Sequence, residues 1–326
     1  MRHLTVRHES WPLAKALNIS RGSRASAEIV VVEIADRGFA GRGECMPYAH
    51  YGETVDSVMA EIAALRDRIE GGLDRVVLQD LMPAGAARNA VDCALWDLAA
   101  KQLGRRVWRL GGLPAPGPVV TAYTLGVDTP EAMAQAAREV AWRPLIKLKV
   151  TGEGDIDRIA AVRDAAPRSR LIVDANEGWS PAMVEPFSKE LAKLNVAMIE
   201  QPLPAKDDAA LADVPHPVPI CADESCHTRD GLDALVGRYD MVNIKLDKTG
   251  GLTEALALRD AARQRGFGLM IGCMVATSLS MAPAVLVAQG AEVVDLDGPL
   301  LLAKDRENGL VYDGSTVMPP EAELWG

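Results

Sequence analysis

The feature that most constrains the fold is a set of short β-rich runs that recur along the last two thirds of the chain. Their starts lie roughly 20 to 27 residues apart, which leaves room for one crossover helix between successive strands. Helical patterns such as DIDRIAAVRDAA and GLTEALALRDAARQRG fill several of these intervals, with Gly or Pro at their ends. The runs are VVTAYTL, LIKLKV, RLIVDAN, VAMIEQP, VPICADE, MVNIKLDK, GLMIGCM and EVVDLDG.

Eight strands that alternate with helices predict an α/β fold, a parallel (β/α)8 barrel of the TIM type. A doubly wound open sheet is the alternative for the same alternation. We favour the barrel because no glycine-rich phosphate loop follows the first strand. The barrel domain is predicted over residues 116–303.

Residues 1–115 have a different pattern and are predicted to form an α+β capping domain. EIVVVEIAD followed by GFAGRGECMP is typical of an antiparallel hairpin. TVDSVMAEIAALRDRI and ARNAVDCALWDLAAKQLG are typical of amphipathic helices, the second ending at Gly104. We expect the tail, residues 304–326, to pack back on the cap and complete it through Trp325.

The overall charge argues against nucleic acid or an anionic membrane as a partner. The formal net charge is −10 and the isoelectric point is near 5.1, whereas both partners attract basic surfaces. The 5 cysteines are odd in number and scattered, which indicates reduced thiols in a cytoplasmic protein. The N-terminus carries charges throughout and lacks the apolar core of a secretory signal.

One uncharged stretch, residues 266–291, is long enough to cross a bilayer. It is interrupted by Gly272, Pro283 and several hydroxyl side chains, and it lies among repeating strands and helices. We therefore expect a buried strand followed by a buried helix here, and no membrane span.

Acidic residues close three successive predicted strands. Asp174 ends LIVD, Glu200 ends AMIE, and Asp223 with Glu224 ends ICADE. Any one of these acids alone is more often a helix cap or a surface charge. Because the carboxyl ends of barrel strands meet at one face, the three together are expected to converge. Crowded carboxylates need a cation, and oxygen ligands select Mg²⁺, Mn²⁺ or Ca²⁺.

Lysines flank these acids on the neighbouring strands. Lys147 and Lys149 alternate within IKLKV and therefore point to the same side of their strand, and Lys245 ends MVNIK. The alternative is that these lysines are ordinary surface residues, since lysine is rarely buried without a partner. That alternative would require the strands to face water, against their apolar pattern. We expect the three lysines to point into the barrel mouth.

This order of residues around the barrel predicts proton transfer. Lys149 and Lys245 would flank a metal from opposite sides, so that one removes the α-proton of a substrate and the other returns it. A positioned base supplies on the order of 10² to 10⁴ in rate, well short of typical enzymatic barrier reductions of about 8 to 23 kcal/mol. Mg²⁺ and Lys147 are therefore expected to stabilise the negative charge of the enediolate.

The chain resembles the enolase superfamily, in its muconate-lactonizing branch. The resemblance rests on KLK, on DAN after LIV, on EQP, ADES and NIKLDKTGGLTEAL, and on the cap helix NAVDCALWDLAAKQLG, and it spans nearly the whole chain. It implies a modified (β/α)7β barrel with an α+β cap. Within that branch, CADESCHT and DLDGP are similar to the dipeptide epimerases, of the kind that acts on L-Ala-D/L-Glu in murein peptide recycling.

The resemblance also implies roles for individual residues. Asp174, Glu200 and Asp223 correspond to the Mg²⁺ ligands, with Mn²⁺ as a substitute, and Lys149 and Lys245 correspond to the two acid/base catalysts. These roles agree with those inferred from the strand order alone.

The substrate contacts rest mainly on the resemblance. It implies that Asp295 and Asp297 bind the free α-ammonium of a dipeptide, which their charge suits. Taken alone, the pair could equally be a helix cap and its neighbour. Arg24 corresponds to an arginine directed at the glutamyl side chain, although a loop arginine is more often simply exposed. Thr124 and Cys273 match substrate-lining positions.

The resemblance also implies that the loops around Arg24 and at residues 48–53 close over the substrate, and small changes there can redirect an epimerase to other dipeptides. An epimerase of other dipeptides is therefore one alternative.

Four further rival functions remain open at this stage. A cycloisomerase or o-succinylbenzoate synthase would share the metal and the lysines, but its substrate lacks the ammonium group that DLDGP would bind. A mandelate-type racemase would need a late-strand histidine, which the chain lacks. A Schiff-base aldolase leaves the three acids without a role. A non-catalytic metal or peptide binder is the alternative of a different class, and the sequence leaves open whether the chain forms a homo-oligomer.

Overall fold

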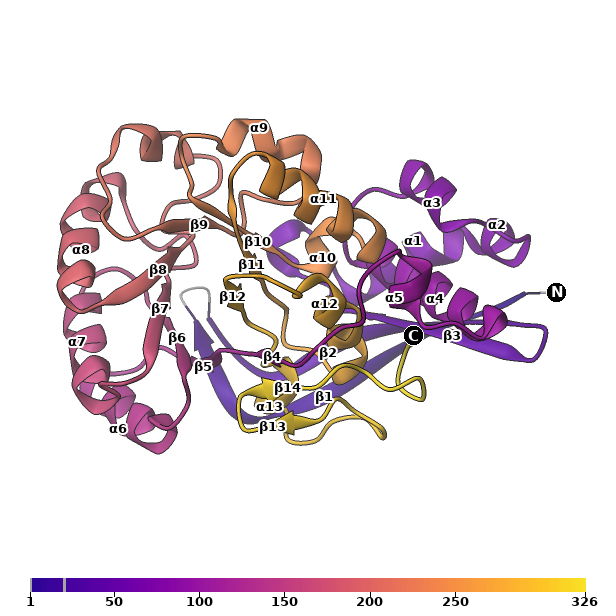
Figure 1. Cartoon of the computed structure of the whole chain (residues 1–326), viewed down its shortest axis with the longest axis horizontal. Coiled ribbons are helices and arrows are strands. Elements are labelled where there is room, and N and C mark those ends of the chain that lie inside the picture. Colours follow the sequence, from indigo (N-terminus) through magenta and orange to yellow (C-terminus); the bar gives the residue numbers. More distant parts are fainter. Residues whose placement is uncertain (1, 20–21) are drawn as a thin grey trace.

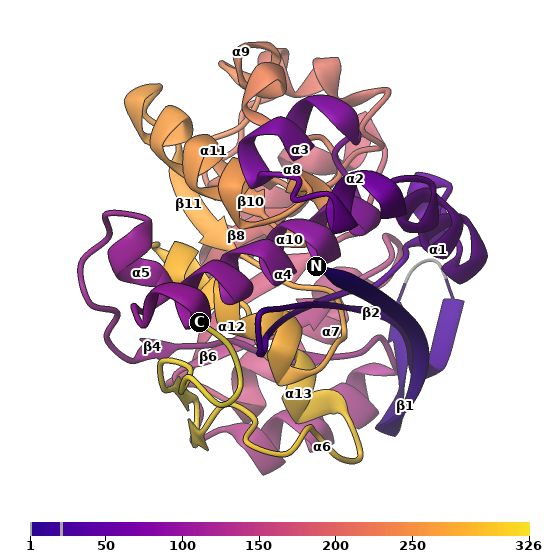
Figure 2. The same cartoon turned by 90° about the vertical axis from the view of Figure 1, so that its right-hand side faces the viewer.

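The computed structural model describes residues 2–19 and 22–326. Figure 1 shows a strongly curled parallel sheet wrapped by helices, with an antiparallel sheet and a group of helices packed beside it. Viewed from that second part, helix α4 (Ala86–Leu103) crosses the face, and both chain ends lie on this side (Figure 2).

The parallel sheet confirms the predicted barrel. Its strands follow one another in sequence order around the barrel. The two outermost strands approach each other through a bond from Ala122 N to Val294 O of 2.8 Å and one from Leu296 N to Thr121 Oγ1 of 2.7 Å. The strands are β5 (Tyr123–Leu125), β6 (Leu145–Lys149), β7 (Arg170–Asp174), β8 (Val196–Glu200), β9 (Ile220–Ala222), β10 (Met241–Ile244), β11 (Gly268–Ile271) and β12 (Val293–Val294).

Helical segments occupy the seven crossovers between these strands, and β12 is followed by the single turn α13 (Gly298–Leu301). Figure 1 shows α6, α7 and α8 along the outer side of β6, β7 and β8. The crossover segments are α6 (Pro130–Val140), α7 (Asp155–Ala165), α8 (Pro181–Lys193), η2 (Asp208–Asp213), η3 (Arg229–Gly231), α9 (Leu232–Leu235), α10 (Leu246–Thr249), α11 (Leu252–Gln264) and α12 (Ser278–Val287).

The cap contains the predicted hairpin, β2 (Gly22–Asp36) and β3 (Phe39–Cys45), and a long first strand, β1 (His3–Ile19), that the sequence pattern did not indicate. Few β1 side chains are buried, so its sequence lacks the alternation that marks a half-buried strand. The helices of the cap are α1 (Val55–Ala64), α2 (Arg66–Glu70), α3 (Arg75–Leu81), α4 and α5 (Val107–Leu110), and the turn η1 (Ala49–Tyr51) precedes them.

The tail packs against the cap, as its apolar end suggested. Arg42 Nη2 donates to the carbonyl oxygens of Glu323 and Leu324 at 2.8 and 2.7 Å, and Trp325 Nε1 donates to Cys93 O at 3.0 Å. The tail strands β13 (Tyr312–Asp313) and β14 (Thr316–Val317) also pair with β4 (Val119–Val120). The run VVTAYTL, predicted as one strand, is therefore divided between two sheets. The domain boundaries at 115 and 303 stay a prediction.

Burial decides which end of the barrel can hold a site. A layer of apolar side chains fills the amino-terminal end of the barrel, including Leu145, Ile172 and Met270. The uncharged stretch at 266–291 forms β11 and the buried α12, as predicted. In the described part of the chain, no helix is long and apolar enough to cross a membrane. Polar side chains gather at the opposite, carboxyl end.

Candidate active site

The three predicted acids meet at the carboxyl ends of neighbouring strands, which we call the barrel mouth. Asp174 ends β7 and pairs in register with Glu200, which ends β8, and Asp223 directly follows β9. All three carboxylates are buried. Other residues occupy the N-cap positions of the helices and turns that follow, so the interpretation of these acids as helix caps is wrong.

The predicted lysines point into the same mouth. Lys147 Nζ lies 3.1 Å from Asp174, 2.7 Å from Glu200 and 2.7 Å from Asp295, and only 2% of its side chain is exposed. Lys149 Nζ, two residues along β6, lies 2.6 Å from Asp174. We call Asp174, Glu200 and Asp223 the row of acids. Because side chains alternate along a strand, Lys147 and Lys149 both direct their ammonium groups toward this row.

Asp223, the third acid, lies between two further lysines. Lys245 follows β10, and its Nζ lies 2.6 Å from Asp223 Oδ2. Lys248 lies one turn later in α10, and its Nζ is 2.6 Å from Asp223 Oδ1. Lys149 and Lys245 thus occupy opposite ends of the row of acids, on β6 and after β10, as the sequence order predicted.

Unusual backbone conformations hold the loops that follow the acids. Asn176, Glu177 and Gln201 have positive φ angles of 44°, 66° and 34°, and each lies just after β7 or β8. Such residues cost on the order of 1–3 kcal/mol each and persist where the surroundings fix them. Gln201 Oε1 accepts bonds from the backbone N of Asp223 at 2.8 Å and of Ser225 at 3.1 Å. These bonds fix the backbone that carries the third acid.

Burial and lysine contacts divide the acids electrostatically. Burial by itself would raise the pKa of Asp174, but Lys149 and Lys147 hold that pKa below its ordinary value. Asp223 behaves in the same way, with Lys245 and Lys248 as its partners, and its pKa falls well below the usual range. For Glu200, burial and then the charge of Asp174 raise the pKa to about 7.

The donor set at the mouth fits a cation. The carboxylates outnumber the lysines among the mouth residues, and the charges of Asp174 and Asp223 add to the effect of burial in raising the pKa of Glu200. Lys147 lies between Asp174 and Glu200, and within residues 2–19 and 22–326 no three His, Cys, Asp or Glu side chains are placed to hold a metal ion. The metal-ligand roles of the three acids therefore stay a prediction.

Asp295 and Asp297 follow β12 and face the same pocket. Asp297 Oδ2 accepts a bond from Thr124 N at 2.7 Å, and Asp295 Oδ2 accepts one from Lys147. Asp297 occupies the N-cap position of α13, but its side chain makes no capping bond and accepts the bond from Thr124 instead. Burial, followed by the charge of Asp295, raises the pKa of Asp297 to about 7. The pair adds further carboxylates to the side of the pocket next to Lys147.

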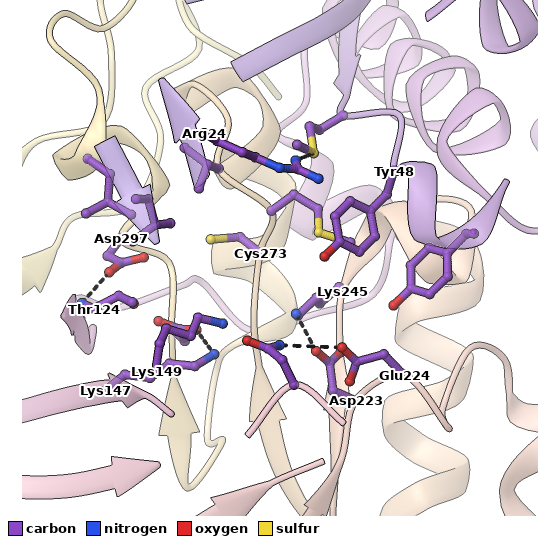
Figure 3. A pocket seen from close by; sticks show the side chains of 18 residues that line it. Arg24, Tyr48, Thr124, Lys147, Lys149, Asp223, Glu224, Lys245, Cys273 and Asp297 are labelled. Carbon is purple, nitrogen blue, oxygen red and sulfur yellow. Dashed lines mark hydrogen bonds and ion pairs between the residues drawn. The ribbon is translucent and has the colours of Figure 1, made fainter. Parts of the chain in front are cut away.

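The cap closes the pocket with an arginine and an aromatic ring. Arg24 comes from β2; its Nη1 lies 3.8 Å from Met46 Sδ and its Cζ lies 4.8 Å from the centre of the Tyr48 ring. Figure 3 shows Arg24 and Tyr48 on the cap side and Asp297 with Thr124 on another side. Cys273 also lines the pocket, so every predicted substrate residue reaches it.

Sequence reasoning missed residues that line or support the pocket. Asn176 lines it, and Lys248 contacts Asp223. The position of Lys248, one helical turn after Lys245, was the available signal. Tyr51 lines the pocket from the loop at residues 48–53, and a contact of 2.8 Å between His50 Nε2 and Glu177 Oε2 joins this loop to the barrel. That contact joins residues far apart in the chain.

Comparison with known families fits this geometry. Residues 1–112 match the family described as "Mandelate racemase / muconate lactonizing enzyme, N-terminal domain", and residues 131–323 match "Enolase C-terminal domain-like". The chain belongs to the enolase superfamily. The resemblance stated from the motifs, and the (β/α)7β barrel with its cap, are thereby confirmed.

Two curated relatives are similar to this superfamily member over nearly its whole length. The L-Ala-D/L-Glu epimerase of Escherichia coli K12 is 51% identical over 314 residues, covering 96% of this chain and 98% of that protein. The N-acetyl-D-glutamate racemase of Pseudoalteromonas sp. is 47% identical over 300 residues, covering 91% and 95%.

Two solved structures carry ligands. An enolase family member from Agrobacterium tumefaciens with homology to dipeptide epimerases, holding sodium and L-Ala-L-Glu, is 53% identical with a TM-score of 0.98 and covers 100% of both chains. The dipeptide epimerase of Enterococcus faecalis V583, complexed with Mg and L-Leu-L-Tyr, is 30% identical with a TM-score of 0.91, covering 98% of this chain and 96% of that one.

Proposed function

We propose that this protein epimerises the α-carbon of the C-terminal residue of a dipeptide, with L-Ala-D-Glu and L-Ala-L-Glu as the preferred pair. The observation that carries the proposal is the placement of Lys149 and Lys245 at opposite ends of one row of buried carboxylates. A substrate between them would present one face of its α-carbon to each lysine. Transfer of the α-proton to the neutral amine of one lysine, followed by delivery of a proton from the ammonium group of the other lysine, inverts the centre.

The remaining mouth residues would serve charge and orientation. Lys147, which contacts Asp174, Glu200 and Asp295, would balance the negative charge that forms beside the lost proton. We infer that Asp174, Glu200 and Asp223 would hold Mg²⁺, with Mn²⁺ as a substitute. When bound, the cation would act as a Lewis acid on the substrate carboxylate.

The substrate class follows from the charges around the pocket. Asp295 and Asp297 form a negative pair that suits the free α-ammonium of a dipeptide. Arg24, on the opposite rim, presents a planar fork that suits the glutamyl side-chain carboxylate. The names of the Escherichia coli relative and of the Agrobacterium ligand support the same substrate.

Racemisation of an N-acylated glutamate is the second candidate, because one relative is named for it at 47% identity. Such a substrate offers Arg24 the same side chain but lacks the ammonium group. The raised pKa of Asp297 favours this candidate, since a protonated carboxyl can donate a hydrogen bond to the carbonyl oxygen of the acyl group. The negative charge of the pair favours the dipeptide. Cycloisomerase and o-succinylbenzoate synthase substrates also lack the ammonium group.

One assay separates these candidates. Purified protein with Mg²⁺ in deuterated water is incubated with L-Ala-L-Glu and, in parallel, with N-acetyl-L-glutamate, and deuterium at the glutamyl α-carbon is followed by NMR. The proposal expects exchange and formation of L-Ala-D-Glu, faster than any exchange on the acetyl compound. A faster reaction on N-acetyl-L-glutamate would establish the second candidate. No exchange on either compound or on a dipeptide library would overturn both and favour a non-catalytic binder.

A matched variant tests the ammonium site. Asp297→Asn removes one negative charge and keeps an oxygen that can accept the Thr124 N–H bond. The proposal expects a higher KM for L-Ala-L-Glu and little change for N-acetyl-L-glutamate. Equal changes for both substrates would argue against an ammonium contact at Asp297.

The biological setting is part of the same proposal. The described cysteines are all free thiols, which suits a reducing compartment such as the cytoplasm. Epimerisation of L-Ala-D-Glu would serve murein peptide recycling. The net charge of −10 gives no reason to expect a nucleic-acid or membrane partner, and a homo-oligomer is compatible with the proposal.

A further inference from the structure

A buried carboxylate joins the cap to the turn that carries Lys245. Asp247 lies two residues after Lys245, in α10, and is only 4% exposed. Its Oδ1 accepts a bond from the backbone N of Met46 at 3.1 Å and another from Asn89 Nδ2 at 2.9 Å. Both donors belong to the cap, so this carboxylate faces the cap.

The cap segment held by Asp247 is the one that supports Arg24. Asn89 Nδ2 also lies 3.3 Å from Glu44 O, so the chain is fastened at both Glu44 and Met46, at the end of β3. Met46 Sδ contacts the Arg24 guanidinium, which also lies over the Tyr48 ring. A continuous set of contacts therefore runs from the Lys245 turn to Arg24.

Arg24 and Lys245 lie on different sides of the pocket and come from different domains (Figure 3). Their separation decides where the α-carbon of a bound substrate lies when its side chain is held by the arginine. A misplacement of about 1 Å can lower a rate on the order of 10²-fold. A contact that fixes this separation should therefore affect the glutamyl substrate in particular.

A second carboxylate offers a matched comparison. Asp92, on α4, is also buried between cap and barrel, and it accepts bonds from Thr253 N at 2.9 Å and Thr253 Oγ1 at 2.6 Å. It supports α11 and does not line the pocket. We call Asp92, Asp247 and their bonding partners the seam. Asp247 is the member of this pair that contacts the Arg24 support.

We propose that Asp247 is a positioning residue that sets the glutamyl-reading Arg24 at its working distance from Lys245, and thereby contributes to selection of a glutamyl substrate. The inference rests on the proposed function, since it assumes that Arg24 reads the side-chain carboxylate. Asp247 itself touches no substrate.

The structure also indicates that loss of this carboxylate leaves α10 in place. Arg88, on α4, donates to the carbonyl oxygens of Thr249 and Gly250 at 2.7 and 3.1 Å, at the far end of α10. Lys245 should therefore stay near Asp223 in an Asp247→Ala variant. The freed segment would be the one around Met46, and with it the position of Arg24.

The experiment compares kcat/KM for L-Ala-L-Glu with that for L-Ala-L-Gln, which has the same shape without the side-chain charge. Asp247→Ala is expected to lower the value for L-Ala-L-Glu by roughly 10- to 100-fold and that for L-Ala-L-Gln by less than about 3-fold. Asp92→Ala, the matched seam variant, should change both substrates by one common factor. Equal factors for both substrates in Asp247→Ala would overturn the proposal.

A double variant removes the remaining structural explanation. In an Arg24→Met background, Asp247→Ala should have little further effect on L-Ala-L-Glu, because the residue that it positions is gone. A multiplicative loss in that background would mean that Asp247 acts on general stability and would overturn the proposal. Asp247→Asn keeps an acceptor for both bonds and should restore the preference for glutamate.

Two safeguards keep the test decisive. If Asp247→Ala does not fold, Asn89→Ala removes the partner amide and should lower the L-Ala-L-Glu preference in the same direction, and an unchanged preference would overturn the inference. If the wild type acts on neither dipeptide, the proposed function fails, and N-acetyl-L-glutamate with N-acetyl-L-glutamine replaces the pair. If Asp247→Ala leaves the ratio of kcat/KM for N-acetyl-L-glutamate to that for N-acetyl-L-glutamine unchanged, the positioning role alone is overturned. Inactivity of the wild type on all four compounds overturns both proposals.

Discussion

Buried carboxylates at the barrel mouth and at the seam differ in their partners. At the mouth, Asp174 and Asp223 each contact two lysines, and their pKa values lie below the ordinary range. At the seam, Asp92 and Asp247 receive hydrogen bonds from neutral donors, and burial raises their pKa values to about 6 and about 7. These four carboxylates are all buried, yet the pKa values of the first two are lowered and those of the other two are raised.

The difference shows that the partners of a buried acid, more than its burial, indicate what it does. A carboxylate paired with two lysines, such as Asp174 or Asp223, stays charged, and it can exchange a partner for a cation or a substrate group. A carboxylate held by neutral donors acts as a hydrogen-bond acceptor that joins two domains, and its negative charge destabilises the folded state because it is buried without a cation. Four predictions test this division, from the largest expected effect to the smallest.

The largest effect should follow loss of a proton-transfer lysine at the mouth. Lys149→Ala and Lys245→Ala are each expected to lower epimerisation by about 10² to 10⁴, because each removes one acid/base group. Chiral chromatography of the dipeptide products measures the loss. The control is Lys189→Ala, which removes an exposed lysine paired with Glu185 on α8 and should leave the rate unchanged. Full rates in both mouth variants would refute the two-base mechanism.

Lys147→Met should cause the largest loss of stability. It leaves Asp174, Glu200 and Asp295 without their shared ammonium group, and breaking such a buried pair costs about 3–5 kcal/mol. Urea unfolding without added metal measures the free energy of unfolding. Lys189→Met, at an exposed pair, should change it by less than about 1 kcal/mol. Similar losses in the two variants would remove the distinction between mouth and surface.

Mg²⁺ should stabilise the folded protein through the mouth and not through the seam. At a concentration 100 times its Kd, a ligand adds about 2.7 kcal/mol. Glu200→Gln should reduce this gain in a thermal melt, whereas Asp92→Asn should keep it. An equal Mg²⁺ effect in wild type and Glu200→Gln would count against Glu200 as a ligand.

The smallest effect concerns the pH dependence of the seam. The folded-state pKa of Asp247 is raised to about 7, above an unfolded value of about 3.9, so the folded state binds the extra proton. Stability from this group is present at low pH and lost as pH rises between about 4 and about 7. Asp247→Asn keeps the acceptor and cannot ionise, so its stability relative to wild type should grow by on the order of 2 kcal/mol from pH 5 to pH 8.

Urea unfolding at the two pH values measures this difference. Lys189→Met, which leaves the seam untouched, serves as the control and should show no comparable change with pH. A constant difference between Asp247→Asn and wild type would mean that Asp247 titrates at its ordinary value when folded.

Much of the barrel and of the mouth could be predicted from the sequence. The recurrence of apolar runs predicted the parallel strands, and their order placed Lys149, Asp174, Glu200 and Asp223 together. The path of β1 could not be predicted, because its exposed residues carry no alternation and its pairing with β2 defines it. The prediction of VVTAYTL as one strand was also wrong. Its first part, β4, pairs with the tail strand β14, which comes from the other end of the chain.

The sequence by itself determined which chemical groups reach the barrel mouth, because strand direction and side-chain alternation are local properties of the backbone. Only the tertiary structure decided which partner each group contacts. Lys147 lies between two acids and also contacts Asp295. Asp247 accepts a hydrogen bond from Met46, which lies 201 positions earlier in the chain. Those partners set the charge state of each buried carboxylate, since electrostatic energy depends on distance in space and not along the chain.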